Sequence, residues 1–422
     1  MSCPCGEIGL DLAFMTAMES LAMHLQPTVR PCSGRILVAD DQPHILAALE
    51  ILLNSQGYQT RAACDPDSVL TALQRETFDA VLMDLNYTRD TTGGAEGLGL
   101  VSRIRSLDKT IRLIVMTAWG SVDLAVEAMR RGASDFVQKP WSNTLLLEKI
   151  REQVESCCAL RSSLRQQEEE ELEAREIQQS LLPSVLPNIV GYDISATMRP
   201  ARFVGGDYYD IARITDTTTV FCVADAAGKG LPAALLISNL QPVVKALIRD
   251  GIQPREVCSR ANRILFDIMP ENKFVSFFYG VLDSSTNQLT YCNAGHNPPL
   301  LVRGDGSVGT LKSSGAVLGQ FLDWPYEQAD LQFERGDTLL LFTDGVVEAC
   351  DGQEKPFGEE RLLQLTRERA KNSAHSIQGA LLQAVSRHCG GKFQDDATLI
   401  VLQRETDTAA RYPHVSRQSI LV

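Results

Sequence analysis

Residues 223–235 read VADAAGKGLPAAL: a strand-like apolar run ends at Asp225, a Gly-containing loop follows, and a helical stretch begins near Leu231. A small residue beside the Asp lets backbone and solvent approach closely. The same arrangement of an Asp at a strand end recurs in GGDYYD (205–210), FTDG (342–345) and DDATL (395–399). One such Asp is commonly a turn residue, but four together predict a cluster of carboxylates.

Short β-rich runs separated by Gly, Asn and Asp surround these motifs between residues 185 and 405, and two long helical stretches interrupt them. Many alternating strands with grouped helices predict an α+β domain of two stacked antiparallel sheets flanked by helices. The expected strands are YDISATM (192–198), TTVFCVAD (218–225), FVSFFYGVLD (274–283), QLTYCNAGH (288–296), DTLLLFTDG (337–345) and DATLIVLQ (396–403), and the expected helices cover 231–248 and 254–269.

The predicted carboxylate cluster has a defined chemistry. A cluster of oxygen ligands alone selects Mg²⁺ or Mn²⁺ over zinc. Two such ions can share a bridging carboxylate and lower the pKa of a water between them, which suits hydrolysis of a phosphomonoester without a protein nucleophile. The sequence has no P-loop and no kinase Lys–Glu–Asp set, so phosphoryl transfer from ATP is not expected.

With EIQQSLLP, NAGHNPP and FTDGVVEA added to the motifs above, residues 185–404 resemble the metal-dependent protein phosphatase 2C superfamily in its bacterial sporulation stage II E type. The resemblance implies that Asp225 bridges two Mn²⁺ or Mg²⁺ ions. It assigns Asp207 and the Ala226 carbonyl to one ion, and Asp344 and Asp395 to the other. These four acids are the expected catalytic residues of a protein serine/threonine phosphatase.

Other residues near these motifs have weaker expectations. Asp210 and Asp396 are interpreted as acids that orient the metal ligands or support the structure. His296 in AGHNPP is either a structural turn residue or a proton donor to the leaving oxygen, and the structural interpretation is favoured. AAGKG stands where VSGHG or VSGKG is commoner, so Ala227 lacks a hydroxyl. The helix that starts at Leu231 follows the Asp225 loop directly, so it is a natural route for regulation.

Residues 34–155 alternate strand-like runs (RILVA, DAVLM, IRLIVM, SDFVQ) with helical stretches beginning near His44, Leu98, Val122 and Ser142. This alternation predicts a doubly wound α/β domain with a parallel sheet. Ligands of such sheets lie at the carboxyl ends of the strands. The residues at those ends are Asp40, Asp41, Asp84, Thr117 and Lys139, which predicts a Mg²⁺ site and a carboxylate that can accept a phosphoryl group.

These residues, in LMDLN, MTAWGS and GASDFVQKPW, resemble the response-regulator receiver family. The resemblance implies that a sensor histidine kinase phosphorylates Asp84 and that Asp40, Asp41 and Asp84 hold Mg²⁺. It also implies that Thr117 and Lys139 contact the phosphoryl group and that Phe136 follows the movement of Thr117. The Gly-rich loop YTRDTTGGAEG (87–97) is longer than is usual in this family, which bears on kinase docking.

Residues 156–184 contain no Gly, and Pro183 is their only proline, so a continuous helix is expected to end there. An approximate apolar stripe predicts a coiled-coil linker through which a homodimer could form, and a solvated acidic spacer is the alternative. Residues 1–33 are interpreted as an N-terminal segment without assigned structure and residues 406–422 as a tail.

Composition excludes several classes of protein. The chain has 422 residues, 44% of them hydrophobic, and carries 40 basic and 53 acidic residues for a net charge of −13. Such a charge disfavours nucleic acid and anionic membranes as partners. No apolar run approaches the roughly 20 residues of a membrane span, and no secretory signal is apparent, so a cytoplasmic protein is expected. The 11 cysteines are interpreted as reduced thiols.

Together the two domains predict a two-component response regulator whose output is a metal-dependent protein serine/threonine phosphatase. The resemblance implies a small phosphoserine protein as substrate, typically an anti-sigma-factor antagonist in a partner-switching pathway. The alternative is a phosphorylation-gated adaptor that uses the phosphatase-like domain for partner binding. A DNA-binding regulator is not expected because no basic recognition helix follows the receiver.

Overall fold

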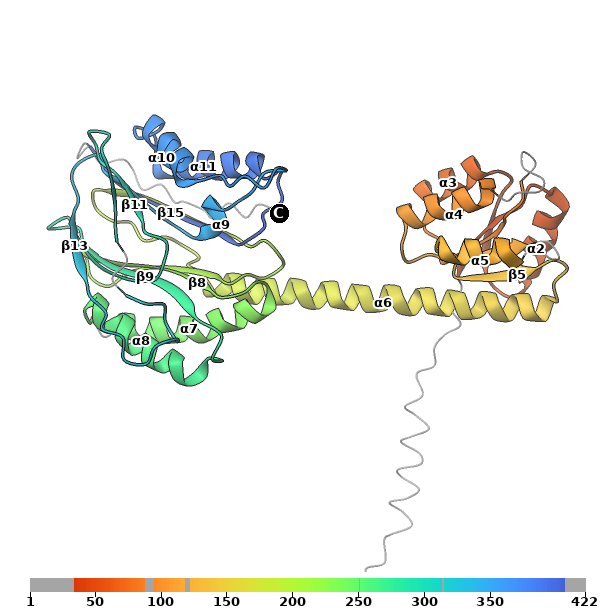
Figure 1. The fold of residues 1–422 in the computed structure, drawn as a ribbon, viewed down its shortest axis with the longest axis horizontal. Helices are drawn as coiled ribbons and strands as arrows, with labels where there is room; N and C mark the ends of the chain where they lie inside the picture. The colour runs from red at the N-terminus through yellow and green to blue at the C-terminus, as the bar shows by residue number, and fades with distance from the viewer. Residues whose placement is uncertain (1–33, 88–94, 118–121, 250, 313–314, 407–422) are drawn as a thin grey trace, which may run out of the picture. The chain divides into compact units, whose positions relative to one another are not determined.

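A computed structural model describes residues 34–87, 95–117, 122–249, 251–312 and 315–406 (Figure 1). The chain divides into two compact units, Met1–Gln167 and Glu168–Val422. The expectations for the N-terminal segment (1–33), most of the long receiver loop (88–94), residues 118–121 of MTAWGS and the tail from residue 407 lie outside the described residues.

The first unit is a parallel sheet with strand order β2-β1-β3-β4-β5. Its inner strands are almost completely buried, as expected for strands that helices cover on both faces. The predicted α/β receiver architecture is therefore confirmed. The elements are β1 (Arg35–Ala39), α2 (Pro43–Ser55), β2 (Gln59–Ala63), α3 (Pro66–Arg75), β3 (Ala80–Asp84), α4 (Ala95–Leu107), β4 (Arg112–Thr117), α5 (Val122–Arg130) and β5 (Asp135–Gln138).

The strand β2 and the helix α3 were not among the expected elements. Strand β2 reads QTRAA and lies at the edge of the sheet. Only Ala63 of this strand is buried, which is why its sequence needs no apolar run and gave no strand signal. Helix α3 does carry a start signal: the Asp65 side chain accepts hydrogen bonds from the backbone N–H groups of Asp67 and Ser68, and the Ser68 hydroxyl accepts one from the Asp65 backbone N–H. That capping box could have been recognised in the sequence.

The helix α6 (Asn143–Leu181) ends just before Pro183, as predicted, but it starts inside the receiver because no residue interrupts it. Its first part belongs to the receiver core through Leu146, Ile150 and Val154, which are fully buried. Farther along, Leu172 and Ile177 are exposed by 51% and 59%. The apolar stripe expected along the linker is thus partly core and partly open surface.

Arg161 fixes α6 to the receiver. Its guanidinium donates to the carboxylates of Asp79 and Asp108 at 3.0 Å each. It also donates to the Phe78 carbonyl at 2.9 Å and to the Thr110 hydroxyl at 3.0 Å. Phe78 and Thr110 precede β3 and β4, so one side chain holds the amino ends of both strands. The receiver and this part of α6 therefore form one cooperative structure.

The second unit contains two antiparallel five-stranded sheets, ordered β13-β10-β9-β8-β7 and β12-β11-β14-β15-β6. The expected strands and both long helices are present, and the α+β class is confirmed. The bounds are β6 (Tyr192–Arg199), β7 (Asp207–Arg213), β8 (Thr218–Ala226), α7 (Leu231–Arg249), α8 (Pro254–Ile268), β9 (Val275–Asp283), β10 (Gln288–Ala294), β11 (Leu300–Val302), β12 (Val308–Thr310), β13 (Ala329–Gln332), β14 (Thr338–Phe342), α9 (Asp344–Val347), α10 (Glu359–Glu368), α11 (Ala374–His388) and β15 (Ala397–Arg404).

The two sheets pack face to face around Phe221, Phe278, Leu341 and Ile400. Helices α7 and α8 cover the outer face of the first sheet, and α10 and α11 cover the second (Figure 1). In the part of the chain that the structure describes, one stretch, Leu231–Ile248 of α7, is long and apolar enough to cross a membrane by length and composition. Its buried side chains pack into the first sheet's core, which accounts for its apolar character.

The hydrogen bonds of Arg161 predict a measurable loss of receiver stability when this side chain is removed. Arg161→Ala leaves Asp79 and Asp108 without their partner and should destabilise the receiver by about 1–2 kcal/mol, since these ion pairs are only partly screened by solvent. Hydrogen exchange of the β3 and β4 amides in the full chain measures this loss. Arg165→Ala, at an exposed position of the same helix, is the control, and equal exchange in both variants would contradict the assignment.

Candidate functional site

The four predicted metal-binding acids of the second unit come together where strands of both sheets end. Asp207 begins β7 and lies opposite Asp225, near the end of β8, in the strand register. Asp344 follows β14 at the start of α9, and Asp395 lies in the turn before β15. Asp344 and Asp395 both raise the pKa of Asp225 by their charge, so these acids are electrostatic neighbours. We call this group of four residues the acid cage.

Two threonines fix the carboxylate of Asp207. The hydroxyls of Thr343 and Thr398 each donate to its Oδ2 atom at 2.7 Å. Thr343 precedes Asp344 and Thr398 follows the Asp395–Asp396 pair, so the two bonds also tie the first sheet to the second. Neither threonine was predicted to have a role, although both lie inside the quoted motifs.

Asp396 holds the chain that leads into Asp207. Its carboxylate accepts hydrogen bonds from the backbone of Ala201 at 2.7 Å and of Gly206 at 2.6 Å. A side chain at Gly205 would collide with this carboxylate, because an added Cβ would lie 2.4 Å from Asp396 Oδ2. Asp396 thus positions Asp207. Asp210 instead pairs with Lys245 of α7 at 2.7 Å, far along the strand from the cage.

Burial and mutual repulsion dominate the electrostatics of the cage. Burial, then Asp344 and Asp395, raises the pKa of Asp225 to about 8. Burial and the nearby Asp225 hold the pKa of Asp207 well above its usual range, and burial and Asp395 raise that of Asp344. Like charges in a buried place favour either protonation or a bound cation.

The donor set fits a hard divalent cation. Carboxylate and carbonyl oxygens are the ligands that Mg²⁺ and Mn²⁺ prefer, and no histidine or cysteine side chain belongs to the cage. The Ala226 carbonyl, expected as a further ligand, faces Gly206, where an added Cβ would lie 3.0 Å from it. No three of the cage acids have ligand atoms within 4.8 Å of one another. They are thus spaced more widely than Asp40, Asp41 and Asp84 of the first unit, which meet this criterion.

His296 is a structural residue. It is 2% exposed, and its Nδ1 atom lies 2.8 Å from the Ser276 hydroxyl. The Asn293 side chain hydrogen-bonds both the backbone N–H and the carbonyl of His296, which closes the turn. Burial lowers the pKa of His296 to about 4, so at pH 7 the imidazole is neutral and is not the imidazolium that a general acid would require.

The receiver residues also converge. Asp40, Asp41 and Asp84 place ligand atoms within 4.8 Å of one another. Lys139 contacts Asp40 at 2.9 Å and Asp84 at 2.8 Å, and its backbone N–H donates to the Thr117 carbonyl. Burial raises the pKa of Asp84, which the hydrogen bond from Lys139 opposes.

Phe136 lies on β5 and is 41% exposed, with the Lys149 ammonium 5.7 Å from its ring centre. The structure thus places Phe136 on the surface. Its predicted role as a residue that follows Thr117 stays a prediction.

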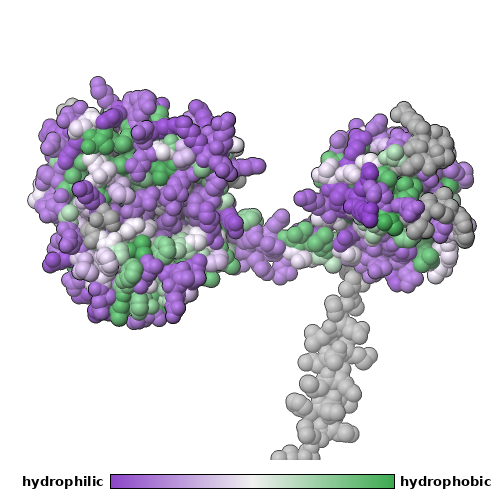
Figure 2. Space-filling view, in the orientation of Figure 1, coloured by the Kyte–Doolittle hydropathy of each residue, from purple (hydrophilic) through white to green (hydrophobic). Residues whose placement is uncertain are grey.

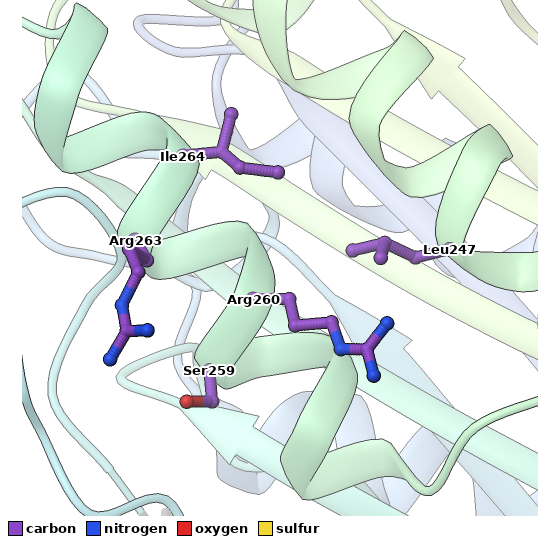
Figure 3. A pocket seen from close by; sticks show the side chains of 5 residues that line it. All are labelled: Leu247, Ser259, Arg260, Arg263 and Ile264. Atoms are coloured by element: carbon purple, nitrogen blue, oxygen red, sulfur yellow. The ribbon is translucent and has the colours of Figure 1, made fainter.

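A surface pocket on the second unit lies apart from the acid cage (Figure 3). Leu247, Ser259, Arg260, Arg263 and Ile264 line it between α7 and α8. Both arginines have acidic partners, Glu256 and Asp323. Figure 2 shows a hydrophobic area over the part of this unit where α7 and α8 lie. Ile264, Phe266 and Ile268 of α8 are exposed apolar side chains. None of the four cage residues lines this pocket.

Family comparisons agree with this geometry. Residues 215–405 match the model for Stage II sporulation protein E (SpoIIE), and residues 36–151 match the response regulator receiver domain. Phosphoserine phosphatase RsbU of Bacillus subtilis is 32% identical over 233 residues, which cover 55% of this chain and 69% of that protein. The chain belongs to the SpoIIE family of PP2C-type phosphatases.

Two further comparisons each match one of the two domains. Sporulation initiation phosphotransferase F of Bacillus subtilis is 32% identical over 129 residues, 31% of this chain and 97% of that protein. The solved SiaA-PP2C domain of Pseudomonas aeruginosa matches with a TM-score of 0.51 at 19% identity, covering 57% of this chain and 98% of that one, which shows a shared fold. The predicted combination of a receiver with a metal-dependent protein serine/threonine phosphatase domain is thus confirmed.

The raised pKa of Asp225 predicts a pH dependence for the metal-free protein. The group has a pKa of 3.8 when exposed and about 8 when folded, so its stabilising contribution is present below about pH 4 and is lost as the pH rises through 8. Between pH 6 and pH 8 the metal-free domain should lose about 2 kcal/mol of stability. Hydrogen exchange of the β8 and β9 amides in EDTA measures it.

Asp225→Asn should flatten this slope, and saturating Mn²⁺ should remove it from the wild type. Equal slopes for the wild type and the variant would show that Asp225 is already ionised in the metal-free cage.

Proposed function

We propose that this protein is a response regulator that hydrolyses phosphoserine on a small protein, and that phosphorylation of Asp84 controls the reaction. The observation that carries the catalytic part is the acid cage, whose mutually repelling carboxylates favour a bound cation. The relative named phosphoserine phosphatase supports the choice of substrate. An anti-sigma-factor antagonist in a partner-switching pathway is the proposed substrate.

We assign the cage ligands as follows. Asp225 bridges two Mn²⁺ or Mg²⁺ ions, Asp207 and the Ala226 carbonyl serve one of them, and Asp344 and Asp395 serve the other. When bound, such ions lower the pKa of a coordinated water and neutralise charge on phosphoryl oxygens. The chain's own residues prepare for this: Thr343 and Thr398 hold the Asp207 carboxylate in one orientation.

The receiver supplies the control. Asp84 accepts a phosphoryl group from a sensor histidine kinase, Asp40 and Asp41 complete a Mg²⁺ site with it, and Lys139 and Thr117 contact the phosphoryl oxygens. Phe136 responds to the new position of Thr117. Support for this assignment is the contact of the Lys139 ammonium with both Asp40 and Asp84.

Helix α6 connects the two parts, and its last turns contact the phosphatase site. The Gln178 side chain donates to the Gly205 carbonyl at 2.6 Å and accepts from the Gly205 N–H at 2.9 Å. Gly205 lies two residues before Asp207, so a shift of α6 would move a metal ligand. The exposed Leu164, Leu172 and Ile177 support a homodimer through this helix, and the proposed location is the cytoplasm.

The catalytic proposal makes a direct prediction. Asp225→Asn removes the carboxylate that serves both ions, and hydrolysis of a phosphoserine peptide in Mn²⁺ should fall by at least about a hundredfold. Asp216→Asn, on an exposed turn of the same domain, is the control. A phosphorylation-gated adaptor would show no Mn²⁺-dependent hydrolysis in either protein.

The control proposal is tested separately. Beryllofluoride should change the hydrolysis rate or the oligomeric state of the wild type and leave Asp84→Asn unchanged. Gln178→Ala should uncouple the rate from beryllofluoride because the bonds to Gly205 are lost, whereas Gln179→Ala, at an exposed neighbouring position, should respond like the wild type. A full response in Gln178→Ala would remove the Gly205 contact from the pathway.

A further inference from the structure

Lys229 lies in the loop between β8 and α7 and contacts the acid cage. Its ammonium is 2.6 Å from Asp395 Oδ2 and donates to the Gln394 carbonyl at 2.9 Å. The other oxygen of Asp395, Oδ1, accepts the Asp396 N–H at 2.9 Å. Both oxygens of this predicted metal ligand therefore already have a partner, and one of them is a cation.

The charge of Lys229 reaches beyond Asp395. Burial raises the pKa of Asp225, Asp344 and Asp396, and the positive charge of Lys229 opposes that rise in each of them. An ammonium at this place lowers the repulsion among the acids. A divalent cation would do the same more strongly.

The loop holds Lys229 at a defined place. Gly228 and Gly230 have φ values of 119° and 67°, which favour glycine, and the Lys273 ammonium donates to the Ala227 carbonyl at 3.1 Å. The Gly230 carbonyl accepts the Ala234 N–H at the start of α7. The distance between the ammonium and Asp395 therefore depends on where α7 begins.

We propose that Lys229 is a tethered counter-ion that competes with the divalent cation for the Asp395 carboxylate. The proposal rests on the function proposed above, since it requires that the cage bind cations. Metal binding on the Asp395 side must displace the ammonium. Any movement of α7 that withdraws Lys229 would raise the affinity of that side, which makes Lys229 a positioning residue that sets metal occupancy.

Calorimetric titration of the metal-free full chain with Mn²⁺ tests the competition. Lys229→Met removes the charge and keeps the length of the side chain, and it should tighten Mn²⁺ binding on the Asp395 side roughly two- to fivefold, the range of one partly exposed ion pair. Lys229→Arg keeps the charge and should resemble the wild type. Lys371→Met, at an exposed position elsewhere in the domain, controls for the loss of one charge.

Thermal unfolding gives a second measurement. The change in melting temperature differs between a lysine that acts as a counter-ion and one that only supports the loop. Lys229→Met should melt at a lower temperature than the wild type when metal-free, because the acids repel without a counter-ion. In saturating Mn²⁺ the difference should vanish. A lysine that only braces the loop would lower the melting temperature in both states.

Other outcomes separate the two proposals. If the wild type binds Mn²⁺ and Lys229→Met binds it equally or more weakly, the competition is wrong while the phosphatase site stands. A raised KM for the phosphopeptide with unchanged Mn²⁺ affinity would make Lys229 a phosphate contact and would also overturn the competition. If the wild type binds no Mn²⁺ at the cage, the proposed function itself fails.

Discussion

Repulsion among buried and half-buried carboxylates is the constraint on which the phosphatase unit depends. Asp207 and Asp225 face each other on neighbouring strands, and Asp344 and Asp395 approach from the second sheet. Burial makes this repulsion stronger than it would be in water. Such an arrangement lowers the stability of the metal-free state, and the cations that we propose for the cage would relieve the repulsion.

Neutral donors and close backbone packing hold the acids in place. The hydroxyls of Thr343 and Thr398 bond Asp207, and Asp396 accepts two backbone N–H groups from the preceding loop. An added Cβ at Gly345 would lie 2.0 Å from the Asp396 carbonyl, so the FTDG turn fits only with glycine there. The glycines beside the aspartates in the motifs are explained by this packing as much as by access for a ligand.

The sequence was sufficient for the parts of the structure that depend on local patterns. Strand-end aspartates with small neighbours predicted the cage, and alternating apolar runs predicted the receiver sheet. Strand β2 was not predictable in this way because an edge strand such as QTRAA buries little. The partners of Gln178, Lys229 and Asp396 were also missed, because each depends on a strand, loop or turn that is distant in the sequence.

Helix α6 runs from the first unit into the second without a break. Arg161 fixes its first part to the receiver, and Gln178 fixes its last turns to the loop before Asp207. The residues between these two anchors are mostly exposed. The control that we propose would act through these two anchors, from the receiver to the loop before Asp207.

The cage itself can be tested by diffraction from crystals of the full chain grown with Mn²⁺, using anomalous scattering at the manganese edge. The account predicts two peaks that share the Asp225 carboxylate, one beside Asp207 and the other beside Asp344 and Asp395. A map without manganese at Asp225, or with Asp344 and Asp395 turned away from every peak, would contradict it.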